Sequence, residues 1–121
     1  MSEPDTDGLL PLTPASFHIL LVLAAGPAHG YAIMQEVPRM TAGGAQLGPG
    51  TLYRTIQKLV GDTLIEAIGA EDDERRVPYR MTKRGHAVAR AEARRLAILL
   101  DVAVQRRLIA PKASPRKGAT A

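Results

Sequence analysis

The spacing of hydrophobic residues changes twice along the chain, and these changes limit the folds that it can adopt. Between residues 13 and 60 the apolar positions recur at the spacing of helices. Residues 64–68 and 76–81 form two short strand-like segments, and the second alternates apolar with polar side chains. Helical spacing returns at residue 83 and continues to about residue 108. The predicted order is therefore helix, helix, helix, strand, loop, strand, helix.

The ends of the predicted helices carry local signals. Thr13-Pro14 is typical of a helix start, with threonine as the N-cap and proline at the first helical position. Thr82 is expected to cap the long last helix in the same way. The first helix is expected to end at Gly26-Pro27, the second to cover about 30–39, and the third to begin at 49–51.

The strand segments and the uneven charges complete the predicted architecture. Pro78 cannot donate a backbone hydrogen bond, so it is expected on the outer, edge arm of a two-stranded ribbon. The predicted fold is mainly α with a small β-wing: a winged helix-turn-helix domain followed by a long C-terminal dimerisation helix. The expected segments are a disordered acidic N-terminus (1–12), a winged helix-turn-helix DNA-binding domain (13–81), the C-terminal dimerisation helix (82–110) and a disordered basic tail (111–121).

The composition excludes several classes of protein. A chain of 121 residues is expected to form one domain, and the absence of cysteine rules out disulfides, thiolate metal sites and cysteine nucleophiles. The N-terminus is acidic where a signal peptide is basic, and no apolar run approaches the ~20 residues that cross a bilayer. A soluble cytoplasmic protein with no membrane partner is therefore expected. The net charge of +4 permits a nucleic-acid partner without requiring one.

No arrangement of residues in the sequence predicts catalysis or metal binding. His18, His29 and His86 lie in three different predicted helices, without carboxylates at metal-ligand spacing. The glycine-rich turns at 43–44 and 48–50 lack the lysine of a phosphate-binding loop. We therefore expect no enzymatic activity, no cofactor and no metal site.

The third predicted helix carries the clearest candidate site. A helical projection places one set of residues on an inward arc: Leu52, Ile56, Leu59 and Val60. The outward arc presents hydroxyl, amide and cationic groups, from Thr51, Arg54, Gln57 and Lys58. Tyr53 lies at the border between the two arcs. Arginine reads guanine with two hydrogen bonds, and threonine and lysine reach phosphates or base edges. The first turn, at Pro49 and Gly50, directs free amides outward, where they can hold a phosphate.

Four stretches of the sequence resemble the PadR family of winged-helix transcriptional regulators. They are HGYAI (29–33), LGPGTLYRTIQKLV (47–60), LIE (64–66) and PYRMTKRG (78–85), within a resemblance that covers about residues 12–95. The resemblance implies a homodimeric, sequence-specific DNA-binding protein of the short branch of the family, usually a repressor that a small molecule relieves. Together, the resemblance and the helical projection mark these candidate DNA contacts: Tyr31, Pro49, Gly50, Thr51, Tyr53, Arg54, Lys58, Arg75 and Arg76.

Two positions depart from the family pattern. The family has glycine just before LIE, where this chain has Thr63. The third helix is expected to end at Val60, so Gly61 is the candidate for the left-handed residue of this turn. The wing tip at 71–74 is acidic, and it either points away from DNA or pairs with Arg75 and Arg76 in the free protein.

The last predicted helix indicates a dimer. Residues 96–104 are apolar almost all round the helix, and one small domain can cover only one side. The other side is expected to meet a second copy across a two-fold axis. The expected interface comprises Phe17, Leu21, Leu96, Leu99, Val102 and Ala103. This interface is either fully packed or holds a small hydrophobic or aromatic effector against Phe17, His18 and Leu99.

Two functions remain open at this point. The first is a dimeric, sequence-specific transcriptional regulator, expected to be a repressor acting on a pseudo-palindromic operator in double-stranded DNA. The second is a winged-helix interaction or nucleoid-type module that binds DNA weakly by charge or scaffolds a protein partner. The second function would depend on the basic tail, so truncation at Ala110 distinguishes the two.

Overall fold

The computed structural model describes residues 8–69 and 77–111 of the chain. Along this part of the chain lie the helices α1 (Pro14–Ala24), α2 (Gly30–Met40), α3 (Pro49–Gly61) and α4 (Lys83–Gln105), and the strands β1 (Ala28–His29), β2 (Ile65–Ala67) and β3 (Pro78–Met81). The strands form one antiparallel sheet in the order β1-β3-β2. The predicted fold, mainly α with a small β-wing and a long last helix, is confirmed.

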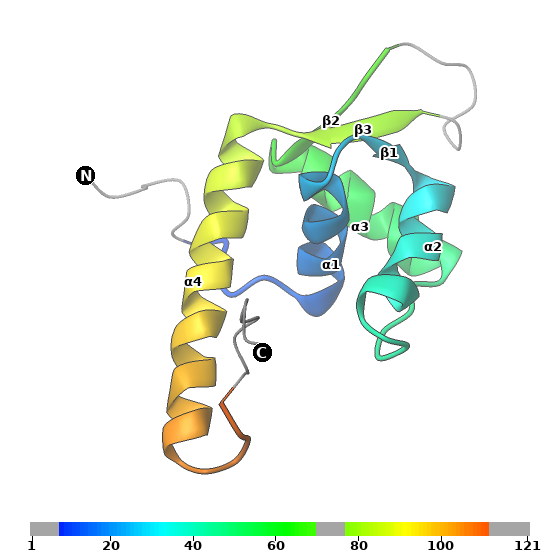
Figure 1. Cartoon of the computed structure of the whole chain (residues 1–121). Coiled ribbons are helices and arrows are strands. Elements are labelled where there is room, and N and C mark those ends of the chain that lie inside the picture. The colour runs from blue at the N-terminus through cyan, green and yellow to red at the C-terminus, as the bar shows by residue number, and fades with distance from the viewer. Residues whose placement is uncertain (1–7, 70–76, 112–121) are drawn as a thin grey trace, which may run out of the picture.

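Helix α1 lies at the centre of the domain (Figure 1). It contacts α2, α3, α4 and strand β3. The sheet closes one end of the group formed by α1, α2 and α3, and α4 runs past α1 and continues beyond the body of the domain. The C-terminal half of α4 therefore projects from the domain.

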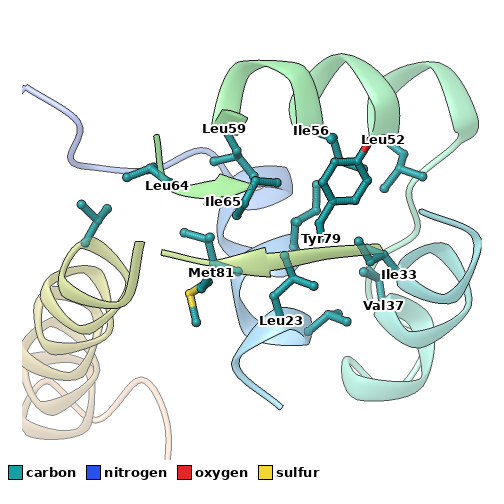
Figure 2. Packing of buried hydrophobic residues seen from close by; sticks show 14 of the residues in the cluster. Leu23, Ile33, Val37, Leu52, Ile56, Leu59, Leu64, Ile65, Tyr79 and Met81 are labelled. Carbon is teal, nitrogen blue, oxygen red and sulfur yellow. The ribbon is translucent and has the colours of Figure 1, made fainter. Parts of the chain in front are cut away.

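The core fills the space between the helices and one face of the sheet. Strand β3 contributes through its alternation, since Tyr79 and Met81 are buried whereas Arg80 between them is exposed. Figure 2 shows the ring of Tyr79 lying between β3 and the α3 residues Leu52 and Ile56. The buried hydrophobic residues are Ile19, Leu20, Val22, Leu23, Ile33, Val37, Leu52, Ile56, Leu59, Leu64, Ile65, Val77, Tyr79, Met81 and Val88.

Two threonines begin helices as predicted. Thr13 Oγ1 accepts a hydrogen bond from the amide of Ser16 at 3.1 Å, at the start of α1. Thr82 Oγ1 accepts one from the amide of Gly85 at 3.0 Å, at the start of α4. Both threonines have extended backbones, so their hydroxyls can satisfy amides that lack a helical acceptor.

Three helices end in one motif whose left-handed residue is not glycine. These residues are Ala42 after α2, Thr63 after α3 and Arg107 after α4, with φ angles of 52°, 59° and 65°. The amide that follows each of them bonds a carbonyl five residues earlier, as Leu64 does to Leu59 at 2.9 Å. Helix α4 consequently ends earlier than its hydrophobic pattern predicts.

The exit from α3 differs from the prediction. Gly61 lies inside α3, and Asp62 is the C-cap, so the left-handed position of the motif falls on Thr63. The prediction that Gly61 supplies the left-handed residue was wrong. The physical reason is that α3 continues past Val60 and that the turn after it is held in place by hydrogen bonds to Thr82.

The sheet has one more strand than predicted. Strand β1 pairs with β3, which therefore lies in the centre, and the prediction of an edge position for Pro78 was wrong. Pro78 is accommodated because it is the first residue of β3. Its carbonyl accepts a hydrogen bond from Ile68 at 2.9 Å, on the side of β2. The missing amide therefore faces the end of β2, and that strand stops at Ala67.

Residues 8–12 lie against the body of the domain, although disorder is predicted from residue 1 to residue 12. Leu9, Leu10 and Leu12 are partly buried against the core. The backbone of Leu12 also hydrogen-bonds to the side chain of Glu92 in α4. These leucines bury apolar surface, which offsets the cost of ordering the segment. The predictions for residues 1–7 and 112–121 fall outside the described residues.

Candidate nucleic-acid interface

Helix α3 presents one apolar face and one polar face. The predicted inward residues Leu52, Ile56 and Leu59 are buried in the core. The predicted outward residues are exposed: Thr51, Arg54, Gln57 and Lys58. The prediction that Val60 packs inward was wrong, since it is 40% exposed. Val60 lies about 80° round the helix from Leu52, at the edge of the buried arc.

The first turn of α3 leaves backbone amides available to a ligand. The N-cap is Gly48, which has no side chain to accept a hydrogen bond, and Pro49 follows at the first helical position. The first helical bond runs from the amide of Leu52 to the carbonyl of Gly48 at 2.9 Å. The amides of Gly50 and Thr51 precede this bond, and both residues are exposed. A phosphate can therefore bind two amides at the positive end of the helix dipole.

The two predicted cations of α3 have different surroundings. Arg54 Nη2 donates to Thr51 Oγ1 at 3.4 Å, so a guanidinium and a hydroxyl lie together near the first turn. Lys58 Nζ lies 3.1 Å from Asp62 Oδ2 in an ion pair at the end of α3. Lys58 must share or break this pair before it can bind a phosphate. Arg54 is therefore the stronger candidate for reading a base.

Tyr53 spans the gap between α2 and α3. It is half-buried against the core, and its ring lies over Gly30, the first residue of α2. A Cβ atom at position 30 would approach Tyr53 Cζ to 2.8 Å, so only glycine fits there without displacing the ring. Tyr31 is exposed on α2, where its hydroxyl accepts a hydrogen bond from Gln35 Nε2 at 3.3 Å. Gly30 and Gln35 were not predicted as site residues; Gly30 falls within the HGYAI motif and Gln35 lies one helical turn after Tyr31.

The wing carries an ion pair between its strands. Arg80 Nε on β3 lies 2.8 Å from Glu66 Oε2 on β2, and both side chains are about half exposed. An exposed pair of this kind adds at most about 1 kcal/mol of stability. The predicted wing contacts Arg75 and Arg76, and the acidic tip at 71–74, lie outside the described residues.

The predicted dimer residues lie on α1 and α4, two helices that contact each other. Four of them are at least 37% exposed: Leu21, Leu96, Leu99 and Val102. The others, including the predicted effector residue His18, are half-buried: Phe17, His18 and Ala103. Further exposed apolar side chains, which the predicted interface did not name individually, lie on or just after α4: Ile98, Leu100, Leu108 and Ile109. The projecting half of α4 therefore has a largely apolar surface.

A partly exposed arginine pairs with a buried carboxylate where α4 leaves the body of the domain. Glu92 is 2% exposed, and its carboxylate accepts hydrogen bonds from Arg95 Nε at 2.7 Å and from Nη2 at 2.8 Å. These hydrogen bonds from Arg95 lower the pKa of Glu92 although burial opposes the charged form, and the positive charge of Arg95 and the backbone of Leu12 add to this effect. The hydrogen bond from the backbone of Leu12 to Glu92 ties α4 to the segment that precedes α1.

Helices α3 and α4 are joined through Thr82. The hydroxyl of Thr82 donates to the carbonyl of Thr63 at 2.7 Å, and its amide donates to the carbonyl of Leu64 at 3.1 Å. Gly85 lies so close to the carbonyl oxygen of Leu64 that any side chain at position 85 would collide with it. Direct backbone contacts therefore set the orientation of α4 relative to α3.

Within residues 8–69 and 77–111, no group of three His, Asp or Glu side chains is placed to hold a metal ion. None of the helices in this part of the chain combines the length and the apolar character needed to cross a membrane.

The sequence is similar to a known family and to a known protein. The transcriptional regulator PadR-like family matches residues 19–91. A relative from Streptomyces fradiae, an uncharacterized 37.1 kDa protein in transposon TN4556, is 34% identical over 85 residues, which cover 70% of this chain and 24% of that protein. The chain thus spans about a quarter of the length of this relative.

Solved structures share the fold. A transcriptional regulator from Clostridium thermocellum has a TM-score of 0.65 at 21% identity, covering 85% of this chain and 97% of that one. A PadR family transcription regulator from Clostridium difficile has a TM-score of 0.65 at 21% identity, covering 77% of this chain and 97% of that one. Because the family match extends over more than half of the chain, this protein belongs to the PadR-like family of transcriptional regulators and has its winged-helix fold.

Proposed function

We propose that this protein is a homodimeric, sequence-specific repressor that acts in the cytoplasm on a pseudo-palindromic DNA operator. One observation carries the proposal: α3 exposes a polar face next to free backbone amides, in a chain of a transcriptional regulator family. A helix of this kind fits the major groove, with its first turn against the DNA backbone and its side chains at base edges.

The proposed complex assigns a role to each part of α3. The amides of Gly50 and Thr51 bind a phosphate, and Arg54, one turn further, donates two hydrogen bonds to a guanine. The phosphate contacts set the register, and the arginine contributes sequence preference. The remaining proposed DNA contacts are Tyr31, Pro49, Tyr53, Lys58, Arg75 and Arg76.

The proposed dimer follows from the apolar surface of α4. Ile98 is 64% exposed and Leu99 is 53% exposed, so a single copy leaves large apolar side chains in water. A second copy removes such surface from water, at about 25 cal/mol per Å² of apolar area, and a two-fold pair is the commonest arrangement. The proposed interface comprises Phe17, Leu21, Leu96, Leu99, Val102 and Ala103. Two α3 helices related by this axis imply half-sites ~34 Å apart, one turn of DNA.

The proposed effector is a small hydrophobic or aromatic compound bound at the dimer interface, beside Phe17, His18 and Leu99. Apolar walls with a few polar groups at a subunit interface suit such a ligand. The ligand weakens DNA binding only by as much as it prefers the DNA-incompetent spacing of the two α3 helices. A panel of hydrophobic aromatic compounds, added to the operator complex and followed by fluorescence anisotropy, tests this. If no compound lowers the DNA affinity and Phe17→Ala only weakens the dimer, the effector proposal is refuted.

Capture of genomic DNA fragments by the full chain, followed by footprinting, tests the operator proposal. Protection of two half-sites about one helical turn apart is expected, and a single asymmetric half-site would refute the arrangement. Arg54→Ala is expected to lose ~1–3 kcal/mol of binding and to relax specificity at one base pair. Arg90→Ala removes the same charge from an exposed position on α4 and is the matched control, with little expected change.

Truncation after Ala110 separates the proposed regulator from a module that binds DNA by charge alone. The regulator should keep its sequence preference and lose only a uniform, salt-sensitive part of its affinity. A module that depends on the basic tail should lose nearly all binding. Loss of all binding in the truncated chain, with the dimer intact, would therefore favour the second function.

A further inference from the structure

A groove runs between α1 and α2. Its volume is about 460 Å³, and most of its wall is apolar: Leu21, Val22, Ala25, Pro27, Ala32 and Met40. Glu36 also lines the groove and is about half exposed. Arg39 lies 4.0 Å from the Glu36 carboxylate, at the limit of an ion pair. The groove therefore combines apolar walls with a weakly paired carboxylate.

The end of α4 carries the complementary chemistry. Arg107 takes the left-handed conformation that ends the helix, with Leu108 and Ile109 directly after it. In this motif the residue in the position of Leu108 commonly packs back on its own helix, yet Leu108 is 75% exposed and Ile109 is 47% exposed. Arg106 and Arg107 are exposed beside them. Two apolar side chains next to two cations match an apolar groove with a carboxylate.

Leu21 connects the groove with the proposed dimer interface. It belongs to that interface and it also lines the groove, together with Met40. Helices α2 and α4 lie on different sides of α1, and the far end of α4 lies beyond the body of its own domain (Figure 1). The proposed two-fold dimer brings the end of each α4 beside the domain of the other copy when its axis crosses α4 near Leu99, so that the two helices run antiparallel.

We propose that residues 106–109 of a second copy dock in this groove. Leu108 and Ile109 contact the apolar walls, and one of the two arginines pairs with Glu36. The inference rests on the proposed homodimer and adds a second contact region to it. It also couples the dimer to the helix-turn-helix, because the groove is formed partly by α2, and α2 packs on α3 where the ring of Tyr53 covers Gly30.

Engineered thiols report this contact directly, because the chain contains no cysteine. Met40→Cys and Leu108→Cys are purified separately, mixed and oxidised, so that a disulfide between the two positions joins two different chains. A disulfide forms when the Cα atoms approach within about 4.4–6.8 Å. We expect a covalent heterodimer with the 40–108 linkage, identified by peptide mass spectrometry. In the matched control Gln57→Cys, an exposed position on α3, replaces Met40→Cys, and no linkage above background is expected.

The proposed charge pair is tested by exchange of the charges. Glu36→Lys is expected to raise the dimer Kd about three- to tenfold, the range for a partly exposed ion pair turned into a repulsion. Combining Glu36→Lys with Arg106→Glu and Arg107→Glu is expected to restore most of the affinity. Sedimentation equilibrium gives the dimer Kd, and a combined variant no tighter than Glu36→Lys alone would overturn the pairing.

The possible outcomes distinguish this inference from the proposed function. A wild-type chain that is a dimer but shows no more 40–108 linkage than the control overturns the inference and leaves the proposed function intact. The double variant Met40→Cys/Leu108→Cys is oxidised at a dilution where monomers prevail. An intrachain disulfide under these conditions would show that the chain's own residues 106–109, and not those of a second copy, occupy the groove. A wild-type chain that is monomeric at micromolar concentration refutes the proposed homodimer and this inference with it.

Discussion

Replacing Thr63 with glycine is expected to stabilise the fold. Thr63 has a φ of 59° and a β-branched side chain, a combination that costs ~1–2 kcal/mol relative to glycine. Glycine loses more backbone entropy on folding, which reduces the stabilisation from relieving this strain by ~0.5–1 kcal/mol. The hydroxyl of Thr63 also bonds the carbonyl of Asp62 at 2.5 Å, but this site is exposed and the bond adds little. The net expected gain is therefore ~0.5–1 kcal/mol, and the backbone bonds to Thr82 remain.

Thermal unfolding at one fixed protein concentration measures this gain, because the Tm of a dimer depends on concentration. For a domain of this size the expected rise in Tm is ~2–8 °C. Gly61→Ala is the matched variant. Gly61 lies inside α3 with open space where a Cβ would point, so alanine there is expected to stabilise by ~0.5–1 kcal/mol.

The two variants together can refute the reasoning. If Gly61 held the left-handed conformation, Gly61→Ala would lower the Tm because alanine resists that conformation. Thr63→Gly would then introduce a flexible residue without relieving strain, and the Tm would stay unchanged or fall. A fall for Gly61→Ala with no rise for Thr63→Gly would show that the exit from α3 is not the one described.

The proposed dimer helix, the proposed DNA contacts of α3 and the ion pair between Glu92 and Arg95 each give a further prediction. Leu99→Glu places a carboxylate in the apolar surface of α4 and is expected to weaken the dimer by several kcal/mol, as light scattering would show; a dimer of unchanged affinity would contradict the proposed interface. Lys58→Ala is expected to weaken binding to all DNA sequences alike and to reduce the salt slope by about one, less if Asp62 keeps its pair with the lysine. The lowered pKa of Glu92 implies a contribution to stability that is present above its ordinary value of 4.5 and is lost as the pH falls through the lowered pKa. Urea unfolding at several acidic pH values measures this loss, and Glu92→Gln should flatten it; an equal slope in both proteins would contradict the prediction.

The sequence predicts the parts of this fold that depend on local pattern. The caps at Thr13 and Thr82 are confirmed because a cap needs only a hydroxyl at the right place beside a helical segment. The burial of Leu52, Ile56 and Leu59 is confirmed because it follows from helical period. These features are set within a few residues of each other.

The parts that were missed depend on contacts between distant segments. Strand β1 has two residues, too few to show a period, and it exists because it pairs with β3. Glu92 has the charge of a surface residue, and it is buried where the backbone of Leu12, from a distant segment, hydrogen-bonds to it. The role of Gly30 depends on the ring of Tyr53, which belongs to another helix. Each of these contacts joins residues far apart in the sequence, so local patterns do not predict it, although Gly30 itself falls within the HGYAI motif.

Because α4 is fixed to the end of α3 at Thr82, a small rotation at this junction produces a large displacement at the far end of α4. Helix α4 has 23 residues, a length of ~35 Å at ~1.5 Å per residue. Thr82 and Gly85 fix the first turn of α4 to the end of α3. A rigid rotation of both helices by ~5° about this first turn therefore moves the far end of α4 by ~3 Å. This displacement is close to the rise of one DNA base pair, ~3.4 Å. In the proposed two-fold dimer the crossing angle of the α4 helices and the separation of the α3 helices therefore change together. A change of one base pair in the spacing of the proposed operator then corresponds to a few degrees of rotation at the dimer interface.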